Sequence, residues 1–150
     1  MLGHHEISLS YSDLQEMLAE LQQQMDVNYR SEGDEISWSL EQPFVNWFSR
    51  SVHLRDDLNL SITEWDVKET FKLIVDAQLQ PLVGFSFCVA GKFRSTVRGS
   101  ETDLIAHAGE TQSGWLQGEV KTISEVAAGQ TVSLIQLSVN SRLLEALIEE

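Results

Sequence analysis

The first apolar pattern along the chain has the period of an α-helix. Between residues 14 and 25 apolar side chains recur at i, i+3, i+4, i+7 and i+11, which places them on one stripe of a helix. The stripe consists of Leu14, Met17, Leu18, Leu21 and Met25. Ser12 followed by Gln15 has the spacing of a capping box, so we expect the helix to begin near Asp13. The stripe is predicted to pack on the domain; the alternative is a helix that binds a partner.

Residues 26–48 are less regular and carry four large aromatic side chains close to Pro43. The segment Arg30–Asp34 has the composition of a turn. The aromatic residues are Trp38, Phe44, Trp47 and Phe48. A polar loop with such side chains usually lies across an apolar surface. We therefore interpret this segment as a strap or lid over the domain that follows, the alternative being that it closes one end of the core.

From residue 50 onward the period of the pattern changes to two, which is typical of β-strands. In Leu58–Thr63 every second residue is apolar, and in Val83–Ala90 bulky side chains occupy one face and small ones the other. Turn glycines then recur every 8 to 11 residues. They are Gly91, Gly99, Gly109, Gly118 and Gly129. Short strands at this spacing predict an antiparallel β-sandwich or barrel.

A second helix is predicted at the end of the sequence, with Asn140 as its N-cap. Its apolar stripe consists of Leu143, Leu144, Leu147 and Ile148. Glu149 and Glu150 would place negative charge at the C-terminus of this helix, where the helix dipole disfavours it. We therefore expect the helix to continue in a longer parent chain and to serve as a transmitter or a dimer contact.

Charge restricts the function more than length does. The 150 residues include 10 Lys and Arg against 23 Asp and Glu, a formal net charge of −13. Such a surface repels phosphate, so we expect this segment to bind neither nucleic acid nor anionic membranes by itself. Apolar runs fall short of the ~18 residues of a membrane span. The single cysteine, Cys88, excludes an internal disulfide and is typical of the cytoplasm.

The sequence predicts no catalytic residues, no metal site and no cofactor. His53 and His107 lie in the β-rich region, but neither has a second histidine at metal-ligand spacing. Cys88 lies among apolar neighbours, where a thiol is expected to be inert. No Gly-x-Ser-x-Gly motif, phosphate-binding loop or dinucleotide fingerprint occurs.

One basic cluster is unusual in so acidic a chain. Lys92, Arg94 and Arg98 share one face of a predicted strand. Together with nearby aromatic residues they could line a pocket for an anionic, partly aromatic ligand. The candidate ligand-binding residues are Trp65, Phe85, Phe87, Arg94, Arg98 and Trp115. The alternative is an exposed strand whose cations pair with surface carboxylates.

Residues 50–150 resemble the N-terminal effector-sensing domain of AraC-type transcription regulators, which is a cupin-like barrel. The segments that carry the resemblance are Ser51–Arg55, Leu58–Thr63, Val83–Gly91, Ala128–Val139 and Leu143–Leu147. Among these regulators the chain is most similar to the branch that senses ferric siderophores such as pyochelin. The resemblance implies a small-molecule effector, a possible homodimer, and DNA contact only through a C-terminal helix-turn-helix domain absent from these residues.

These observations together predict a mainly β, cupin-like antiparallel barrel or sandwich with a helix at each end. We divide it into an N-terminal helix and strap (1–48), the barrel (49–139) and the start of a linker helix (140–150). The predicted function is regulatory sensing of a small molecule, without catalysis. One alternative is a small cupin-like enzyme, an isomerase or metal-independent hydrolase, using His53 or His107 beside Glu64. Another is a dimerisation module without a ligand.

Overall fold

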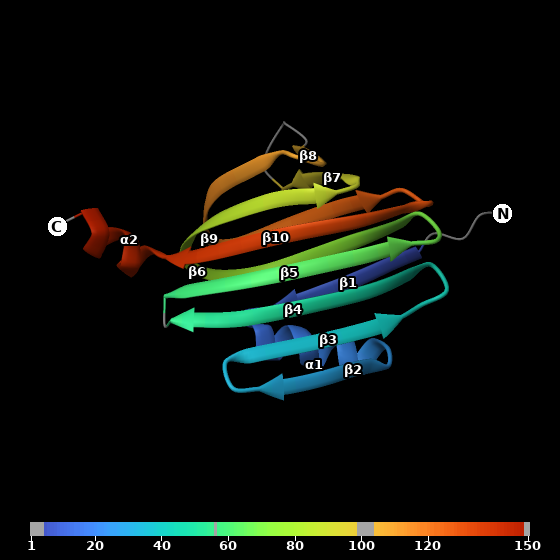
Figure 1. The fold of residues 1–150 in the computed structure, drawn as a ribbon, viewed down its shortest axis with the longest axis horizontal. Coiled ribbons are helices and arrows are strands. Elements are labelled where there is room, and N and C mark those ends of the chain that lie inside the picture. The colour runs from blue at the N-terminus through green and yellow to red at the C-terminus, as the bar shows by residue number, and fades with distance from the viewer. Residues whose placement is uncertain (1–4, 56, 99–103, 149–150) are drawn as a thin grey trace.

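The computed structural model describes residues 5–55, 57–98 and 104–148, and the backbone alone at residues 144, 147 and 148. Most of the chain is β-strand (Figure 1). The strands are β1 (His5–Tyr11), β2 (Val27–Glu32), β3 (Glu35–Glu41), β4 (Val45–Arg55), β5 (Leu58–Val67), β6 (Phe71–Ala90), β7 (Lys92–Val97), β8 (Leu104–His107), β9 (Thr111–Val126) and β10 (Gln130–Asn140). The helices are α1 (Leu14–Gln24) and α2 (Ser141–Ile148). The predicted mainly β architecture with two terminal helices is confirmed.

All ten of these strands join one sheet, which has the order β2-β3-β4-β5-β10-β6-β9-β7-β8, with β1 paired to β6. The pairs along this path are antiparallel, whereas β1 runs parallel to the first half of β6. The second half of β6 pairs with β10, and the register of β6 against β9 shifts between Leu79 and Leu82. Side chains of β4, β5, β7 and β9 line one cavity, so the sheet curls around an interior.

The predicted apolar stripe of α1 faces the core. Leu18 and Leu21 are buried, and Met17 packs against the same cluster. The capping box begins one residue later than the sequence predicts. Asp13 Oδ1 accepts a hydrogen bond from the Glu16 backbone N–H at 2.9 Å, and Glu16 Oε2 accepts one from the Ser12 N–H at 2.7 Å. This exchange satisfies two N–H groups that a helix start leaves without partners.

The aromatic segment that we expected to form a strap is part of the sheet. Trp38 lies in β3 and Trp47 in β4, both on the inner side of the sheet and both 5% exposed. Phe44 lies just before β4 and is buried, whereas Phe48 points outward and is exposed. The expected boundary between residues 48 and 49 falls inside β4. Buried and less buried residues alternate in β3 and β4, as in other strands. The closely spaced aromatic residues and Pro43 make this alternation hard to recognise in the sequence.

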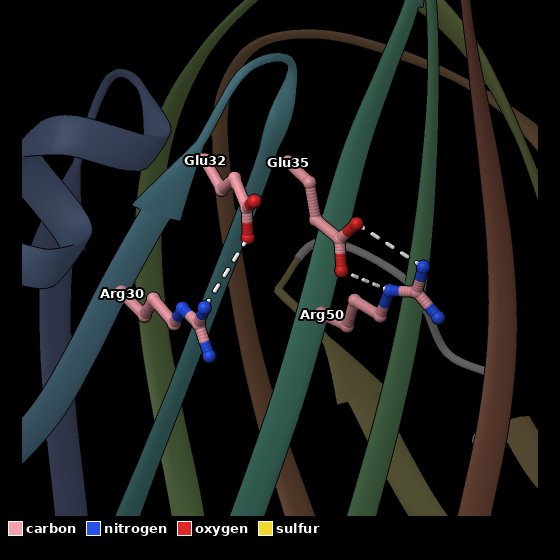
Figure 2. Close-up of polar contacts among 4 residues, drawn as sticks. All are labelled: Arg30, Glu32, Glu35 and Arg50. Carbon is pink, nitrogen blue, oxygen red and sulfur yellow. Dashed lines mark hydrogen bonds and ion pairs between the residues drawn. The ribbon is translucent and has the colours of Figure 1, made fainter.

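The outer face of β2, β3 and β4 carries two ion pairs, one between β3 and β4 and one within β2. Figure 2 shows Arg50 of β4 meeting the carboxylate of Glu35 of β3 with two guanidinium nitrogens, and Arg30 near Glu32 at 3.4 Å. The hydrogen bond and charge of Glu35 raise the pKa of Arg50 above its ordinary value. Both pairs are exposed, so they contribute little to stability and belong to the surface rather than the interior.

The chain ends in α2, as predicted. The side chain of Asn140 caps it, because Asn140 Oδ1 accepts a hydrogen bond from the Arg142 N–H at 2.9 Å. Leu143 is partly buried. The side chains of Leu144, Leu147 and Ile148, and all of Glu149 and Glu150, lie outside the described residues. Neither described helix is long and apolar enough to cross a membrane.

Candidate ligand-binding cavity

The curled sheet encloses a cavity of about 530 Å³. Its walls are the inner faces of β3, β4, β5 and β10 together with those of β6, β7 and β9, and Leu9 and Tyr11 of β1 and the start of α1 complete the lining. A volume of this size is typical of sites for small molecules. Because paired residues in a sheet share a face, the lining can be followed as rows across the strands.

The deepest row is aromatic. Trp47 of β4 pairs in register with Trp65 of β5, and their rings meet edge to face with centroids 5.8 Å apart. Trp65 also meets Phe71 and Phe93 edge to face, at 6.0 and 5.8 Å. Such contacts fix the orientation of the rings, because the edge of one aromatic system is attracted to the face of another. This end of the cavity is therefore a rigid apolar wall.

The next row contains hydroxyl groups that hydrogen-bond to one another across strands. Ser49 Oγ of β4 accepts a hydrogen bond from Trp47 Nε1 at 3.0 Å and lies 2.9 Å from Thr63 Oγ1 of β5. On the opposite wall Ser95 Oγ of β7 lies 2.8 Å from Ser124 Oγ of β9. These pairs satisfy part of the hydrogen-bonding capacity of buried hydroxyls and leave the rest for an occupant.

The far end of the cavity is polar and reaches solvent. Ser51, Ser61 and Gln136 form one row across β4, β5 and β10, and Asn59 follows in the next. Asn59 and Gln136 are exposed, which places the opening at this end. The lining thus grades from aromatic at the closed end to amide and hydroxyl at the opening.

Tyr11 and Asp13 bring the only titratable side chains among the described lining residues. Burial raises the pKa of Tyr11, so its phenol stays protonated at neutral pH. The Asp13 carboxylate is exposed and caps α1. No Lys, Arg or His occurs in the described lining. The cavity therefore offers hydroxyl, amide and indole groups rather than a counter-charge.

Of the six candidate ligand-binding residues, the structure places Trp65 in the cavity. Phe85 and Phe87 lie on the outer face of β6, 39% and 38% exposed, and Trp115 on the outer face of β9 is 56% exposed. Their orientation follows from strand alternation, because buried Cys88 occupies the inner side of β6. The small residues of Val83–Ala90 therefore face inward, and the bulky ones, which we expected to line a pocket, lie outside this cavity.

The two arginines of the basic cluster also lie outside the cavity. In β7 the lining residues are Phe93 and Ser95, so Arg94 between them faces outward, and it is exposed. Arg98 is likewise exposed and absent from the lining. The cluster belongs to the outer surface, as in the alternative interpretation of the sequence.

Sequence reasoning missed the hydroxyl rows and two of the three tryptophans of the cavity, Trp38 and Trp47. The available signal was the polar side of the alternating strands, as in Asn59, Ser61 and Thr63. A polar stripe without charged residues is uncommon on a solvated face, where Lys and Glu dominate. In β5 this stripe faces inward, whereas Glu64 faces outward.

The residues of the enzyme alternative do not line the cavity. His53 is exposed and its Nδ1 lies 2.9 Å from Asn59 Oδ1. His107 and Glu64 are exposed. Among the residues that the structure describes, no group of three or more His, Cys, Asp or Glu side chains is placed to hold a metal ion.

The family model described as "Regulatory protein PchR N-terminal domain" matches residues 46–150, which is most of the chain. The chain belongs to the PchR N-terminal domain family. The matched segment runs from β4 through α2, whereas β1, α1, β2 and β3 precede it. The cavity of this PchR-type domain uses both parts, because Trp38, Tyr11 and Asp13 come from the preceding segment.

Comparison with curated proteins gives no match. Solved structures similar to this PchR-type domain include a cupin superfamily protein from Desulfitobacterium hafniense, at 9% identity and a TM-score of 0.47, covering 67% of this chain and 84% of the other. A cupin protein from Bacteroides fragilis has 13% identity and a TM-score of 0.46, covering 75% and 85%. Oxalate decarboxylase from Bacillus subtilis has 10% identity and a TM-score of 0.46, covering 74% and 30%.

Proposed function

We propose that this domain is the effector sensor of a transcription regulator, and that the effector occupies the cavity inside the curled sheet. The observation that carries the proposal is the cavity itself, about 530 Å³ with a graded lining, in a chain of the PchR regulatory family. The family supports a regulatory role rather than catalysis. DNA would be contacted by a separate C-terminal helix-turn-helix domain, since the net charge of −13 makes this segment unsuited to phosphate.

A ferric siderophore is the first candidate for the effector, on the basis of the resemblance to siderophore-sensing regulators. The closed end of the cavity, with Trp47, Trp65 and Phe93, suits a ligand that carries aromatic rings. The opening between Asn59 and Gln136 leaves polar groups near solvent for the rest of the ligand. The arginines expected from the sequence to hold an anion, Arg94 and Arg98, do not line this cavity.

The path from effector to output runs through β10. This strand presents Leu134, Gln136 and Ser138 to the cavity and continues directly into α2. If β10 and α2 together can adopt two positions, an effector that binds more tightly to one of them shifts the equilibrium toward that position. The size of the shift is set by the difference between the two affinities. We propose α2 as the transmitter and as a possible homodimer contact, through Leu143 and the stripe predicted with it. A regulator of this design works in the cytoplasm.

The sensor proposal is tested by measuring the melting temperature and the tryptophan fluorescence of the domain with candidate effectors. Ferric pyochelin is added first, then other ferric siderophores, and then a broad panel of metabolites. An effector at 100 times its Kd stabilises the folded state by about 2.7 kcal/mol. Ser61→Phe places a ring inside the cavity and should abolish the shift. Ile62→Phe, on the outer face of the same strand, is the matched control and should keep it.

An unchanged melting temperature and unchanged fluorescence with every compound at saturation would refute the sensor. Equal loss of the shift in Ser61→Phe and Ile62→Phe would place binding outside the cavity. Comparing the two variants also corrects for light absorbed by coloured ferric complexes, since that absorption is the same for both.

A further inference from the structure

The outer face of β5, β10, β6 and β9 carries apolar side chains where the solvent-facing side of a sheet is usually polar. Residues paired in register share a face, and Ser61 and Gln136 line the cavity, so their neighbours along β5 and β10 point outward. The central row of this outer face consists of Leu60, Leu137, Phe85 and Ser113.

The rows on either side have a similar composition. One runs from Ile62 to Thr111, and the other runs from Leu58 to Trp115. Every position in the three rows is apolar except Ser113 and Thr111, and none is charged. We call these three rows the apolar face. A surface of this kind is unusual in a chain with 10 basic and 23 acidic residues, and apolar patches of this extent mark interaction sites.

The surroundings of the apolar face are charged. In the first half of β6 and the second half of β9, Lys72 is paired in register with Glu125, and Lys121 Nζ lies 3.7 Å from Asp76 Oδ2. Along β5 the outward row that follows Ile62 begins with the exposed Glu64. The apolar face is therefore a bounded surface with a polar rim, which is the usual anatomy of a protein interface.

The exposed area of the apolar face is sufficient for a dimer. Trp115 is 56% exposed, and Phe85, Phe87 and Ile135 are 39%, 38% and 38% exposed. Figure 1 shows α2 beyond the ends of the strands rather than over the middle of the sheet. An aromatic side chain has ~150–250 Å² of surface and an aliphatic one somewhat less, so the face exposes roughly 500 Å². Two copies would bury roughly 1,000 Å² before any rim contact is added, which is the size at which specific interfaces begin.

Charge distinguishes between the possible occupants of the apolar face. A basic or acidic partner would meet no opposite charge there and would lose hydration without compensation. A second copy presents the same uncharged rows, and a two-fold axis brings each face against its equal. We propose that two copies of this chain associate through their apolar faces, with the two sheets packed about 10 Å apart. This interface is distinct from α2 and does not depend on the identity of the effector.

Sedimentation velocity of the 150-residue chain tests this dimer. An interface of this size is expected to have a Kd of roughly 10 μM, so the average mass should rise with concentration between about 1 and 100 μM. It should rise from near the monomer mass of 16.9 kDa toward twice that value. Each copy carries a net charge of −13, so raising NaCl from about 50 to about 500 mM should screen their repulsion and lower the Kd several-fold.

Matched substitutions in one strand locate the contact. Trp115→Glu places a charge in the apolar face and should raise the dimer Kd at least about tenfold, because buried aromatic residues dominate the energy of interfaces. Ile123→Glu makes the same change of charge at a 45% exposed position of β9 outside the face, and should change the Kd by less than about twofold. Phe87→Gln is a second, uncharged variant of the face, and Leu143→Glu tests α2. Circular dichroism checks that each variant is folded.

Four results would overturn the inference. A chain that stays monomeric at about 100 μM in high salt would leave the face to another kind of partner. A Kd that rises with salt would show that opposite charges hold the dimer. Equal effects of Trp115→Glu and Ile123→Glu would place the contact elsewhere, and loss of the dimer in Leu143→Glu alone would assign it to α2. If Trp115→Glu does not fold, an unchanged Kd in Phe87→Gln refutes the proposal.

Discussion

Gly91 connects β6 to β7 at a point where the structure leaves no room for a side chain. Its φ of +78° lies in the left-handed region that L-residues avoid. A Cβ atom built on Gly91 would lie 2.6 Å from the Thr131 carbonyl oxygen, 2.9 Å from Val132 Cγ2 and 3.0 Å from Val132 Cα. Two of these atoms are backbone of β10, whose pairing with β5 restricts any adjustment. Gly91→Ala therefore combines an unfavourable φ with a steric clash.

The two contributions can be estimated separately. Placing alanine at a left-handed φ costs roughly 1–2 kcal/mol. Forcing an extra carbon into a packed region costs a further ~1–3 kcal/mol. Gly91→Ala should therefore lower the free energy of unfolding by about 2–5 kcal/mol, a large share of the ~5–15 kcal/mol of an ordinary domain. Val132 is fully buried, so relaxation there would disturb core packing as well.

Gly109 provides the matched control. It has a φ of +90°, but a Cβ there would have no heavy atom within 4 Å. Gly109→Ala should cost only the backbone contribution of ~1–2 kcal/mol. Urea unfolding followed by circular dichroism measures both values, and the melting temperatures should fall by about 2–4 °C per kcal/mol. Equal destabilisation by the two substitutions would show that contact with Thr131 and Val132 is irrelevant and refute the argument.

Three further predictions concern single side chains. Ser49→Ala removes the acceptor of the Trp47 N–H and should destabilise the fold by ~1–3 kcal/mol in urea unfolding; no change would mean that water replaces the hydroxyl. Burial raises the pKa of Cys88, so iodoacetamide should label the folded protein slowly at neutral pH, whereas rapid labelling would contradict a buried thiol. Because the folded thiol pKa exceeds the unfolded one, its contribution to stability is complete below the unfolded pKa and is lost as pH rises through the folded pKa; Cys88→Ala should flatten this alkaline decline. Glu35→Gln breaks an exposed ion pair with Arg50 and should cost less than ~1 kcal/mol, an effect that 1 M NaCl should remove; a larger, salt-resistant loss would show that the pair is structural.

Local physics explains the elements that the sequence predicts correctly. The stripe containing Leu18 and Leu21 has the helical period, and both residues are buried on one side of α1. The alternation in Leu58–Thr63 corresponds to a strand of the sheet, and three of the predicted turn glycines, Gly91, Gly109 and Gly129, lie between strands. The turn predicted at Gly118 is wrong, because Gly118 lies within β9, and Gly99 lies outside the described residues. Each of these signals depends only on residues close together in the sequence, so it can be interpreted without knowing how the rest of the chain folds.

The candidate site was predicted only in part, because alternation does not say which face of a strand points inward. Trp65 lines the cavity, but Phe85, Phe87 and Arg94 lie on the outer side of their strands. Their side was decided by the curl of the sheet, which joins the two halves of β6 to different neighbours. A cavity inside the sheet also reverses the usual rule, since polar residues such as Thr63 then line the inside.

The sequence by itself determined the β-rich class, the two terminal helices and the acidity, because period, caps and charge are properties of local composition. Only the tertiary structure decided that Trp38 and Trp47 are walls of a cavity and that the basic cluster lies outside it. It also decided which indole donors find a partner, since Trp47 meets Ser49 while Trp38 and Trp65 meet no acceptor among the described residues. Such matches depend on residues brought together across strands, and no single segment of sequence encodes them.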